Sequence, residues 1–292
     1  MNKHLKRLIL GTAQFGSAYG IKNLKKKNLI NHINILKKAK KNKIKYIDTA
    51  PAYNESEKKI GNYNKNNFHI ISKIPKMSSN CNDPINWVLN STKKSLLNLK
   101  RKNLYAVLVH NTSDLMGKKG KKLYKGLKIL KKNGLVKKIG ISIYDIKELD
   151  WIIKLFKFDI VQVPFNILDR KLYTSGWLDK LKKRNIEIHC RSIFLQGLLL
   201  IKRNQRPKKF DKFVDIWNLW HDWLEKKKIK PIEATLSYVL SFKKIDKIIV
   251  GVDNDKQLEN IIKSLKILST QPPDNLATNN NNLINPSMWK NL

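Results

Sequence analysis

Residues 138–164 read KIGISIYDIKELDWIIKLFKFDIVQVP and contain one complete strand–helix–strand unit. The apolar runs at residues 138–142 and 160–164 have the length of strands, and their continuity is typical of parallel strands that are covered on both faces. Residues 146–156 carry apolar side chains at helical spacing between the two runs. The stretch therefore predicts two parallel strands connected by a helix.

The same alternation of strand and helix extends over most of the chain. The expected strands are residues 8–11, 46–49, 70–74, 106–110, 138–142, 160–164, 186–192 and 247–251. Further helices are expected at residues 84–99, 123–132 and 232–242. Because strands and helices alternate throughout, the pattern favours a parallel α/β fold, and eight strands indicate a closed (β/α)₈ barrel, the TIM-barrel architecture.

An open doubly wound sheet is the alternative arrangement of such units. It requires a G-x-G-x-x-G turn directly after a strand, where the backbone receives a pyrophosphate. Residues 11–20 read GTAQFGSAYG, which is rich in glycine but has a different spacing. The closed barrel is therefore the preferred prediction.

The chain of 292 residues is long enough for one barrel domain, which we assign to residues 1–270. An extra helix is expected at residues 210–228, with Trp217, Trp220 and Trp223 on the face that packs against the barrel because they are three residues apart. Residues 271–292 are polar and rich in Asn. We expect them to form a loose C-terminal tail, with folding back over the barrel end as the alternative.

The formal net charge is +38, with 60 Lys and Arg against 22 Asp and Glu. A charge of this size raises the hypothesis of binding to nucleic acid or another polyanion. The lysines are spread over nearly all predicted helices and loops, including residues 25–27, 37–43, 118–122 and 226–230, and no nucleic-acid-binding motif accompanies them. We therefore expect no specific nucleic-acid partner, although the positive field should attract phosphorylated cofactors and anionic substrates.

The chain contains no apolar stretch of about 18 residues, the length that a membrane-spanning helix needs. Residues 1–16 also lack the small-residue cleavage site that follows a secretory signal. We therefore expect a cytoplasmic protein that does not insert into a membrane. Cys81 and Cys190 are too few for a structural metal site and form no C-x-x-C pair, so neither a metal nor a disulfide is expected. The sequence leaves the oligomeric state open.

Four polar or ionisable side chains lie at the ends of three consecutive predicted strands. Asp48 and Tyr53 follow the second strand, Lys73 lies in the third and His110 ends the fourth. In a (β/α)₈ barrel the carboxyl ends of the strands surround the active site, so these side chains should converge. Taken singly, Asp48 could cap a turn, Tyr53 could be a loop aromatic and His110 could be a core histidine. Lys73 is different, because a lysine in an apolar strand is costly unless it meets an anion such as Asp48 on the neighbouring strand.

Together with these four residues, eight segments make the sequence resemble the aldo/keto reductase family over residues 8–268. In chain order they are LGTAQFGSAYGI, IDTAPAYNESEKKIG, SK, VH, GIS, VQVPFN, RSIFLQGLL and VGVDNDKQL, one at each predicted strand. The resemblance implies an oxidoreductase that reduces an aldehyde or ketone with NAD(P)H, or oxidises a sugar hemiacetal in the reverse direction. The segment RSIFLQGLLL is similar to members found among bacterial sugar and surface-polysaccharide enzymes, which implies a sugar-like substrate.

The resemblance assigns a role to each of the four residues at the strand ends. Tyr53 would donate a proton to the carbonyl oxygen, and His110 would hydrogen-bond that oxygen and fix the substrate. A tyrosine has an ordinary pKa near 10, so it needs assistance to share charge in the transition state. Lys73 would favour the phenolate with its ammonium group, and Asp48 would orient Lys73.

The resemblance also implies a cofactor site along the ends of the first, fifth, sixth, seventh and eighth strands. Ser142 and Gln162 would hold the nicotinamide carboxamide, and the residues after the eighth strand would lie under the adenosine. The implied cofactor-binding residues are Gly11, Thr12, Ala13, Ser142, Gln162, Asn166, Arg191, Ser192, Phe194, Leu195, Gly197, Leu198, Gly251, Val252 and Gln257.

The sequence departs from many family members at several of these positions. Ile143 stands where an Asn is frequent, and Arg191 stands where an aromatic ring often stacks on the nicotinamide. A guanidinium can also stack, but its charge disfavours the oxidised ring. Asp253 and Asp255 would repel the 2′-phosphate of NADPH. Three cations could compensate: Lys202, Arg203 and Lys256. We expect NADPH as the cofactor on the basis of the resemblance, with NADH as the alternative.

Two other functions remain as alternatives to carbonyl reduction. A cofactor-binding regulatory or interaction protein could use the same barrel, although it would not need all four residues at the strand ends. Polyanion binding would need lysines gathered on one face, with aromatic side chains between them. Substrate choice is expected to depend on the loops at the barrel mouth, namely Tyr19 and residues 77–82 and 111–117, with the C-terminal tail as a further candidate.

Overall fold

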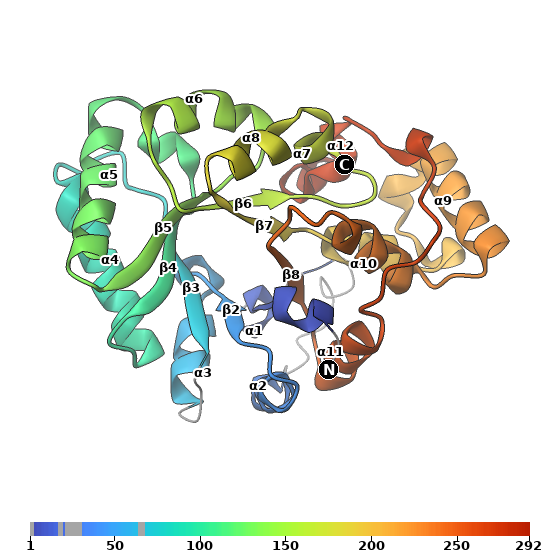
Figure 1. Cartoon of the computed structure of the whole chain (residues 1–292), viewed down its shortest axis with the longest axis horizontal. Helices are drawn as coiled ribbons and strands as arrows, with labels where there is room; N and C mark the ends of the chain where they lie inside the picture. The colour runs from blue at the N-terminus through green and yellow to red at the C-terminus, as the bar shows by residue number, and fades with distance from the viewer. Residues whose placement is uncertain (1–2, 17–19, 21–30, 64–67) are drawn as a thin grey trace.

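Eight parallel strands close into a barrel in the computed structural model, which describes residues 3–16, 20, 31–63 and 68–292 (Figure 1). The strands are β1 Leu8–Gly11, β2 Tyr46–Asp48, β3 His69–Ile74, β4 Leu104–Val109, β5 Val136–Ser142, β6 Ile160–Pro164, β7 Glu187–Arg191 and β8 Lys247–Gly251. They pair in chain order, and β8 pairs with β1 so that Gly251 lies opposite Gly11. The prediction of a closed eight-stranded barrel is therefore confirmed. Tyr19 and the lysines at residues 25–27 lie outside the described residues.

Twelve α-helices are present in the described part of the chain. They are α1 Ala13–Gly16, α2 His32–Lys41, α3 Ser56–Asn62, α4 Pro84–Leu99, α5 Gly117–Lys132, α6 Leu149–Leu155, α7 Lys171–Thr174, α8 Trp177–Lys183, α9 Val214–Lys227, α10 Pro231–Ser241, α11 Asp255–Lys263 and α12 Asn281–Ile284. Figure 1 shows α4 and α5 at one edge of the molecule and α9 at the opposite edge. The bounds of α4 are those expected from the sequence.

Two apolar layers hold the barrel together. Inside it, the side chains of Ile9, Ile71, Leu108 and Ile160 are fully buried. Outside it, the apolar faces of the helices pack against the outward side chains of the strands. Gly140 is required in β5, because a Cβ there would lie 2.4 Å from the Ile160 carbonyl oxygen of the neighbouring strand.

The extra helical segment after β7 packs as its tryptophan spacing predicts. Trp217, Trp220 and Trp223 of α9 are all buried. The Trp220 indole N–H donates to the Leu199 carbonyl oxygen at 3.3 Å, which ties α9 to the segment that follows β7. These aromatic side chains therefore stabilise the fold rather than line a ligand site.

The C-terminal segment folds back over the protein instead of extending from it. It contains α12 and two 3₁₀ helices, η9 (Asp274–Leu276) and η10 (Pro286–Asn291). Leu276, Leu283 and Trp289 are buried although the segment is polar in composition. Asp274 pairs with Arg170 at 3.0 Å, at the loop that follows β6. Of the two outcomes expected for residues 271–292, the structure thus shows folding back.

In the described part of the chain, none of the helices is both long enough and apolar enough to span a membrane. No group of three or more His, Cys, Asp or Glu side chains with the arrangement of a metal site occurs among these residues either. Cys190 is buried, Cys81 is partly exposed, and neither forms a disulfide.

Candidate active site at the barrel mouth

A buried ion pair lies at the mouth of the barrel between β2 and β3. The Lys73 ammonium is 2.6 Å from Asp48 Oδ1, and it also donates to the Thr49 carbonyl oxygen at 3.0 Å. Lys73 is only 1% exposed, so its charge is stable there because Asp48 balances it. The pairing expected from the sequence is therefore present.

A chain of hydrogen bonds continues from this ion pair across the mouth. Gln162 Nε2 donates to Asp48 Oδ2 at 2.8 Å, and Ser142 Oγ donates to Gln162 Oε1 at 3.1 Å. Both carboxylate oxygens of Asp48 thus have partners, and its orientation is fixed from two sides. Ser142 and Gln162, implied as ligands of the nicotinamide carboxamide, are positioned here by their contacts with each other and with Asp48.

Tyr53 ends the 3₁₀ helix η3 (Pro51–Tyr53) that follows β2, and its ring is close to both Lys73 and His110. The Lys73 ammonium is 5.1 Å from the centroid of the Tyr53 ring. The Tyr53 and His110 rings meet edge to face, with centroids 6.0 Å apart and an interplanar angle of 89°. Gly16 makes the position of Tyr53 possible, because a Cβ at residue 16 would lie 1.7 Å from the Tyr53 carbonyl oxygen. The structure therefore brings all four expected residues together.

The electrostatics of the site keep Tyr53 protonated and His110 neutral. Burial raises the pKa of Tyr53 well above its ordinary value; Asp48 adds to this shift and Arg191 opposes it. Burial also lowers the pKa of His110 to about 3, and the charges of Lys73 and Arg191 lower it further. Tyr53 therefore carries its proton at neutral pH, and His110 can act only as a neutral hydrogen-bonding group.

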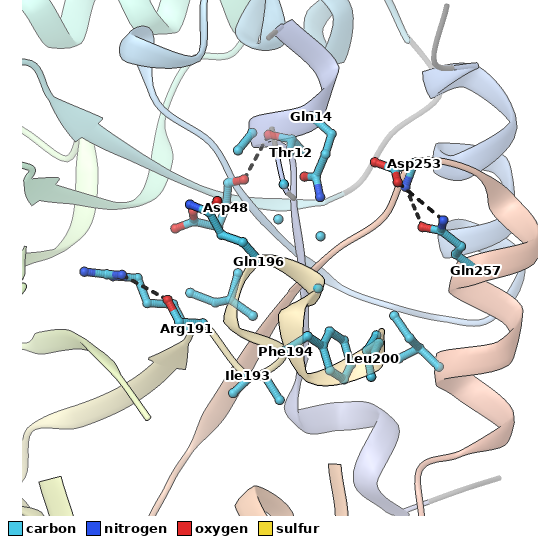
Figure 2. Close-up of a pocket in the computed structure, with 18 of the residues that line it drawn as sticks. Thr12, Gln14, Asp48, Arg191, Ile193, Phe194, Gln196, Leu200, Asp253 and Gln257 are labelled. Atoms are coloured by element: carbon cyan, nitrogen blue, oxygen red, sulfur yellow. Dashed lines mark hydrogen bonds between the residues drawn. The ribbon is translucent and has the colours of Figure 1, made fainter. Parts of the chain in front are cut away.

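A cavity of about 290 Å³ extends from Asp48 and Tyr53 to the start of α11. Figure 2 shows Asp48 and Arg191 on one side of it and Asp253 and Gln257 on the other, with Phe194 and Leu200 between them. Ten of the implied cofactor-binding residues line it: Gly11, Thr12, Ala13, Gln162, Arg191, Ser192, Phe194, Gly197, Gly251 and Gln257.

Five of the implied cofactor-binding residues do not line this cavity. Leu195, Leu198 and Val252 belong to the hydrophobic core. Asn166 is fully buried and holds its own loop: its Oδ1 accepts from the Leu168 amide at 2.9 Å, and its Nδ2 donates to the Ser192 carbonyl oxygen at 3.1 Å. Ser142 lies behind Gln162. Asn166 and Ser142 thus contact two residues that do line the cavity, Ser192 and Gln162.

The cavity also has polar lining residues that were not expected from the sequence, namely Gln14, Gln196 and Asn260. Gln14 packs so closely on β8 that a Cβ on Gly251 would lie 2.4 Å from its Nε2. The signal for Gln14 was its place in the glycine-rich segment after β1. Asn260 is three residues after Gln257 in α11, so helical spacing puts the two on one face.

The shape and lining of the cavity fit a long ligand with a polar group at each end. At one end lie Tyr53, Gln162 and Arg191, and at the other lies the N-terminus of α11, where Asn254 caps the helix by accepting from the Gln257 amide at 2.9 Å. Between them, Gly197 has a φ of 91° with open space where a Cβ would stand. A nicotinamide dinucleotide has a polar group at each end, and a helix N-terminus suits its phosphate-bearing half.

Two of the loops expected to select the substrate, residues 77–82 and 111–117, are joined by a hydrogen bond. The amide of Met77 donates to Asp114 Oδ2 at 2.8 Å, which links the loop after β3 to the loop after β4. None of residues 77–82 or 111–117 lines the cavity.

Comparisons with known proteins agree with this geometry. The model of the aldo/keto reductase family matches residues 7–274. Among solved structures, an aldo-keto reductase from Bacillus halodurans in its holo form is 18% identical with a TM-score of 0.72, covering 92% of this chain and 89% of that one. A glycerol dehydrogenase from Gluconobacter oxydans is 19% identical with a TM-score of 0.70 and coverage of 91% and 88%. A putative aldo-keto reductase from Pseudomonas aeruginosa is 22% identical with a TM-score of 0.65 and coverage of 89% of both chains. None of the curated proteins compared with the chain matches it.

Proposed function

The chain belongs to the aldo/keto reductase family of NAD(P)-dependent oxidoreductases, and we propose that it reduces the carbonyl group of a small aldehyde or ketone with Tyr53 as the proton donor. The observation that carries this proposal is the convergence of Tyr53, His110 and the Asp48–Lys73 ion pair, because Asp48 and Tyr53 line one end of a cavity whose other end is the N-terminus of α11. We further propose a sugar or sugar derivative as the substrate and a cytoplasmic role in carbohydrate metabolism, supported by the segment RSIFLQGLLL.

Each residue at the barrel mouth has a part in the proposed reaction. The neutral His110 donates a hydrogen bond to the carbonyl oxygen and holds the carbonyl group in line. When bound, the reduced cofactor supplies the hydride. Tyr53 gives its proton to the same oxygen as negative charge develops there. Lys73 stabilises the phenolate left on Tyr53, and Asp48, held by Gln162, keeps Lys73 in place.

An assay with a panel of aldehydes, ketones and aldoses tests the proposal. Oxidation of the reduced cofactor that depends on both the protein and a carbonyl compound is expected, with higher kcat/KM for hydroxylated substrates than for apolar ones of equal length. Equal or higher kcat/KM for the apolar compounds would overturn the proposal of a sugar-like substrate. The proposal of carbonyl reduction would still stand.

The lowered pKa of His110 makes a prediction about pH. With a pKa of about 3, the imidazole is neutral at every pH above about 4, so it should produce no change in kcat/KM between about pH 5 and 8. Activity should fall only at alkaline pH, above about 10, because the pKa of Tyr53 is raised. The pH profiles of the wild type and of His110→Gln check this. A rise in wild-type activity below about pH 6.5 that the variant lacks would show instead that protonated His110 acts as the acid.

For the cofactor we propose NADPH, as family membership and the strongly positive charge of the chain favour it. Asp253 works against this choice, since it lines the cavity beside the start of α11. Its amide donates to Gln257 Oε1 at 2.8 Å, and Gln257 Nε2 donates back to its carboxylate at 3.4 Å, so the carboxylate has a defined position. Arg203, one of the cations expected to compensate, pairs instead with Asp222 and Glu225 on α9.

Replacement of Asp253 by serine should therefore strengthen NADPH binding about five- to tenfold and change NADH binding less than twofold, because only NADPH places a dianionic phosphate near that carboxylate. Fluorescence titration of the protein with NADPH and with NADH measures both dissociation constants. Asp215→Ser is the matched control, because it makes the same change of charge on the exposed surface of α9. If Asp253→Ser strengthened the binding of NADPH and NADH equally, general electrostatics rather than the 2′-phosphate would explain the effect.

A further inference from the structure

Arg191, at the end of β7, carries an unbalanced charge at the reacting end of the cavity. The charged residues among the described lining residues are Asp48, Arg191 and Asp253. Asp48 is balanced by Lys73, and Asp253 lies at the α11 end. Within the described residues, Arg191 has no carboxylate at ion-pair distance, unlike Arg170, which pairs with Asp274. The reacting end of the cavity therefore has a net positive charge.

Neutral groups hold the Arg191 guanidinium in place. Its Nη2 donates to the Ile143 carbonyl oxygen at 2.7 Å, and its Nη1 donates to Ser192 Oγ at 3.2 Å. The guanidinium also lies over the ring of Tyr144, 4.6 Å from the centroid. Ile143 and Tyr144 follow β5. Residues 143 and 191, the two positions that depart from the family pattern, are in direct contact through the hydrogen bond to the Ile143 carbonyl oxygen. None of these partners neutralises the charge of Arg191.

Asp169, a buried carboxylate that interacts with the charge of Arg191, offsets this charge only in part. Asp169 is 2% exposed, and burial raises its pKa to about 6, while Lys171 and Arg191 oppose the shift. Its Oδ1 accepts from the Lys171 amide at 3.3 Å rather than from the guanidinium. Asp169 is ionised at neutral pH, but it does not make an ion pair with Arg191.

The position of Arg191 places its charge next to the nicotinamide ring in the proposed reaction. Arg191 and Tyr53 line the same end of the cavity, and the charge of Arg191 lowers the pKa of both Tyr53 and His110. Hydride transfer requires the ring within about 3.5 Å of a carbonyl carbon whose oxygen contacts Tyr53. The ring must therefore lie at the end of the cavity that Arg191 lines.

On the basis of the proposed function, we infer that Arg191 makes this protein bind the reduced nicotinamide cofactor more tightly than the oxidised one. The reduced ring is neutral and electron-rich, so a nearby guanidinium attracts it. The oxidised ring carries a positive charge, so the same guanidinium repels it. The phosphates are identical in the reduced and oxidised cofactor. The ratio of the affinities of the two forms therefore isolates the effect of Arg191 on the nicotinamide ring.

This selectivity acts on cofactor exchange and not on the transfer step. Tighter binding of the reduced form makes hydride donation on the protein less favourable by the same factor, because the two equilibria are linked. The gain is in capture of the reduced cofactor and in release of the oxidised one, so Arg191 suits a protein that works in the direction of reduction.

Titration of the full chain with both redox forms, followed by tryptophan fluorescence at fixed ionic strength, tests the inference. The ratio of Kd for the oxidised form to Kd for the reduced form should fall about tenfold in Arg191→Gln. Arg191→Lys, which keeps the charge, should retain most of the wild-type ratio. Arg203→Gln removes an exposed arginine that does not line the cavity and should leave the ratio unchanged.

The outcomes separate this inference from the proposed function. If Arg191→Gln weakened binding of both forms equally, Arg191 would serve only to hold its loop to Ile143 and the inference would be overturned. If the wild-type chain bound neither form, the proposed function itself would fail. All of these outcomes are measured by cofactor binding and do not depend on an activity assay.

Discussion

Replacement of Tyr53 by phenylalanine should lower kcat for carbonyl reduction about 10³-fold and change the affinity for the reduced cofactor less than twofold. The substitution removes one hydroxyl group, the proposed proton donor, and keeps the ring that lies close to Lys73 and His110. General acid catalysis contributes about 10² to 10⁴ in rate, which sets the expected size of the loss. Steady-state kinetics and cofactor titration on the same preparation provide both values.

Tyr173→Phe is the control for this experiment. Tyr173 lies in α7, is 57% exposed and does not line the cavity, so the loss of its hydroxyl group should leave kcat unchanged. Residual activity of Tyr53→Phe above about one tenth of the wild type would mean that another group donates the proton. In that event His110 would be the next residue to replace.

Replacement of Lys73 by methionine should cost about 3 to 5 kcal/mol of unfolding free energy and remove most activity. The substitution leaves the Asp48 carboxylate buried, with Gln162 as its remaining donor, and an unpaired buried charge is strongly destabilising. The same uncompensated charge next to Tyr53 would make its phenolate harder to form. Urea unfolding and initial rates measure the two effects.

A double-mutant cycle distinguishes the ion pair from simple loss of packing. Asp48→Asn combined with Lys73→Met removes both charges, so the double variant should be more stable than the sum of the single losses implies. Additive losses would show that the Asp48–Lys73 pair has no coupling energy. Lys244→Met breaks an exposed pair with Asp179 and should cost less than about 1 kcal/mol.

The fold was predictable because each strand is a short apolar run and each is separated from the next by a helix. The bounds of β1, β6 and β8 agree with those expected. β4 and β5 begin two residues earlier than expected, at Leu104 and Val136, because these two residues are paired across the strands. Local composition does not record such pairing, and the ends of strands are set by their neighbours.

The Asp48–Lys73 ion pair was predictable from one physical rule, namely that a buried lysine needs an anion. The bond from Gln162 to Asp48 was not, because it joins residues 114 apart in sequence across the mouth of a closed barrel. The same limit applies to the contact of Arg191 with the Ile143 carbonyl oxygen. Both departures from the family pattern were visible in the sequence, but their contact appears only in three dimensions.

Resemblance of a segment to a family does not tell which of its side chains face the cavity, as the expected cofactor-binding residues show. Leu195, Leu198 and Val252 neighbour residues that line the cavity, yet they point into the core. Whether a side chain in an irregular segment faces a cavity depends on backbone angles such as the positive φ of Gln196 and Gly197, and no periodic pattern encodes these. The polar C-terminal segment is similar: a few residues, Leu276, Leu283 and Trp289, hold it against the protein despite its composition.

The most direct test of carbonyl reduction by this protein follows the hydride itself. Reduced cofactor that carries deuterium at both hydrogen positions of the nicotinamide C4 is incubated with the protein and a reactive aldehyde, and the alcohol product is analysed by mass spectrometry. We expect one deuterium on the former carbonyl carbon for each cofactor oxidised. Saturable cofactor binding with no deuterium in the alcohol from any aldehyde, ketone or aldose would contradict the proposed function and favour a cofactor-binding protein without reductase activity.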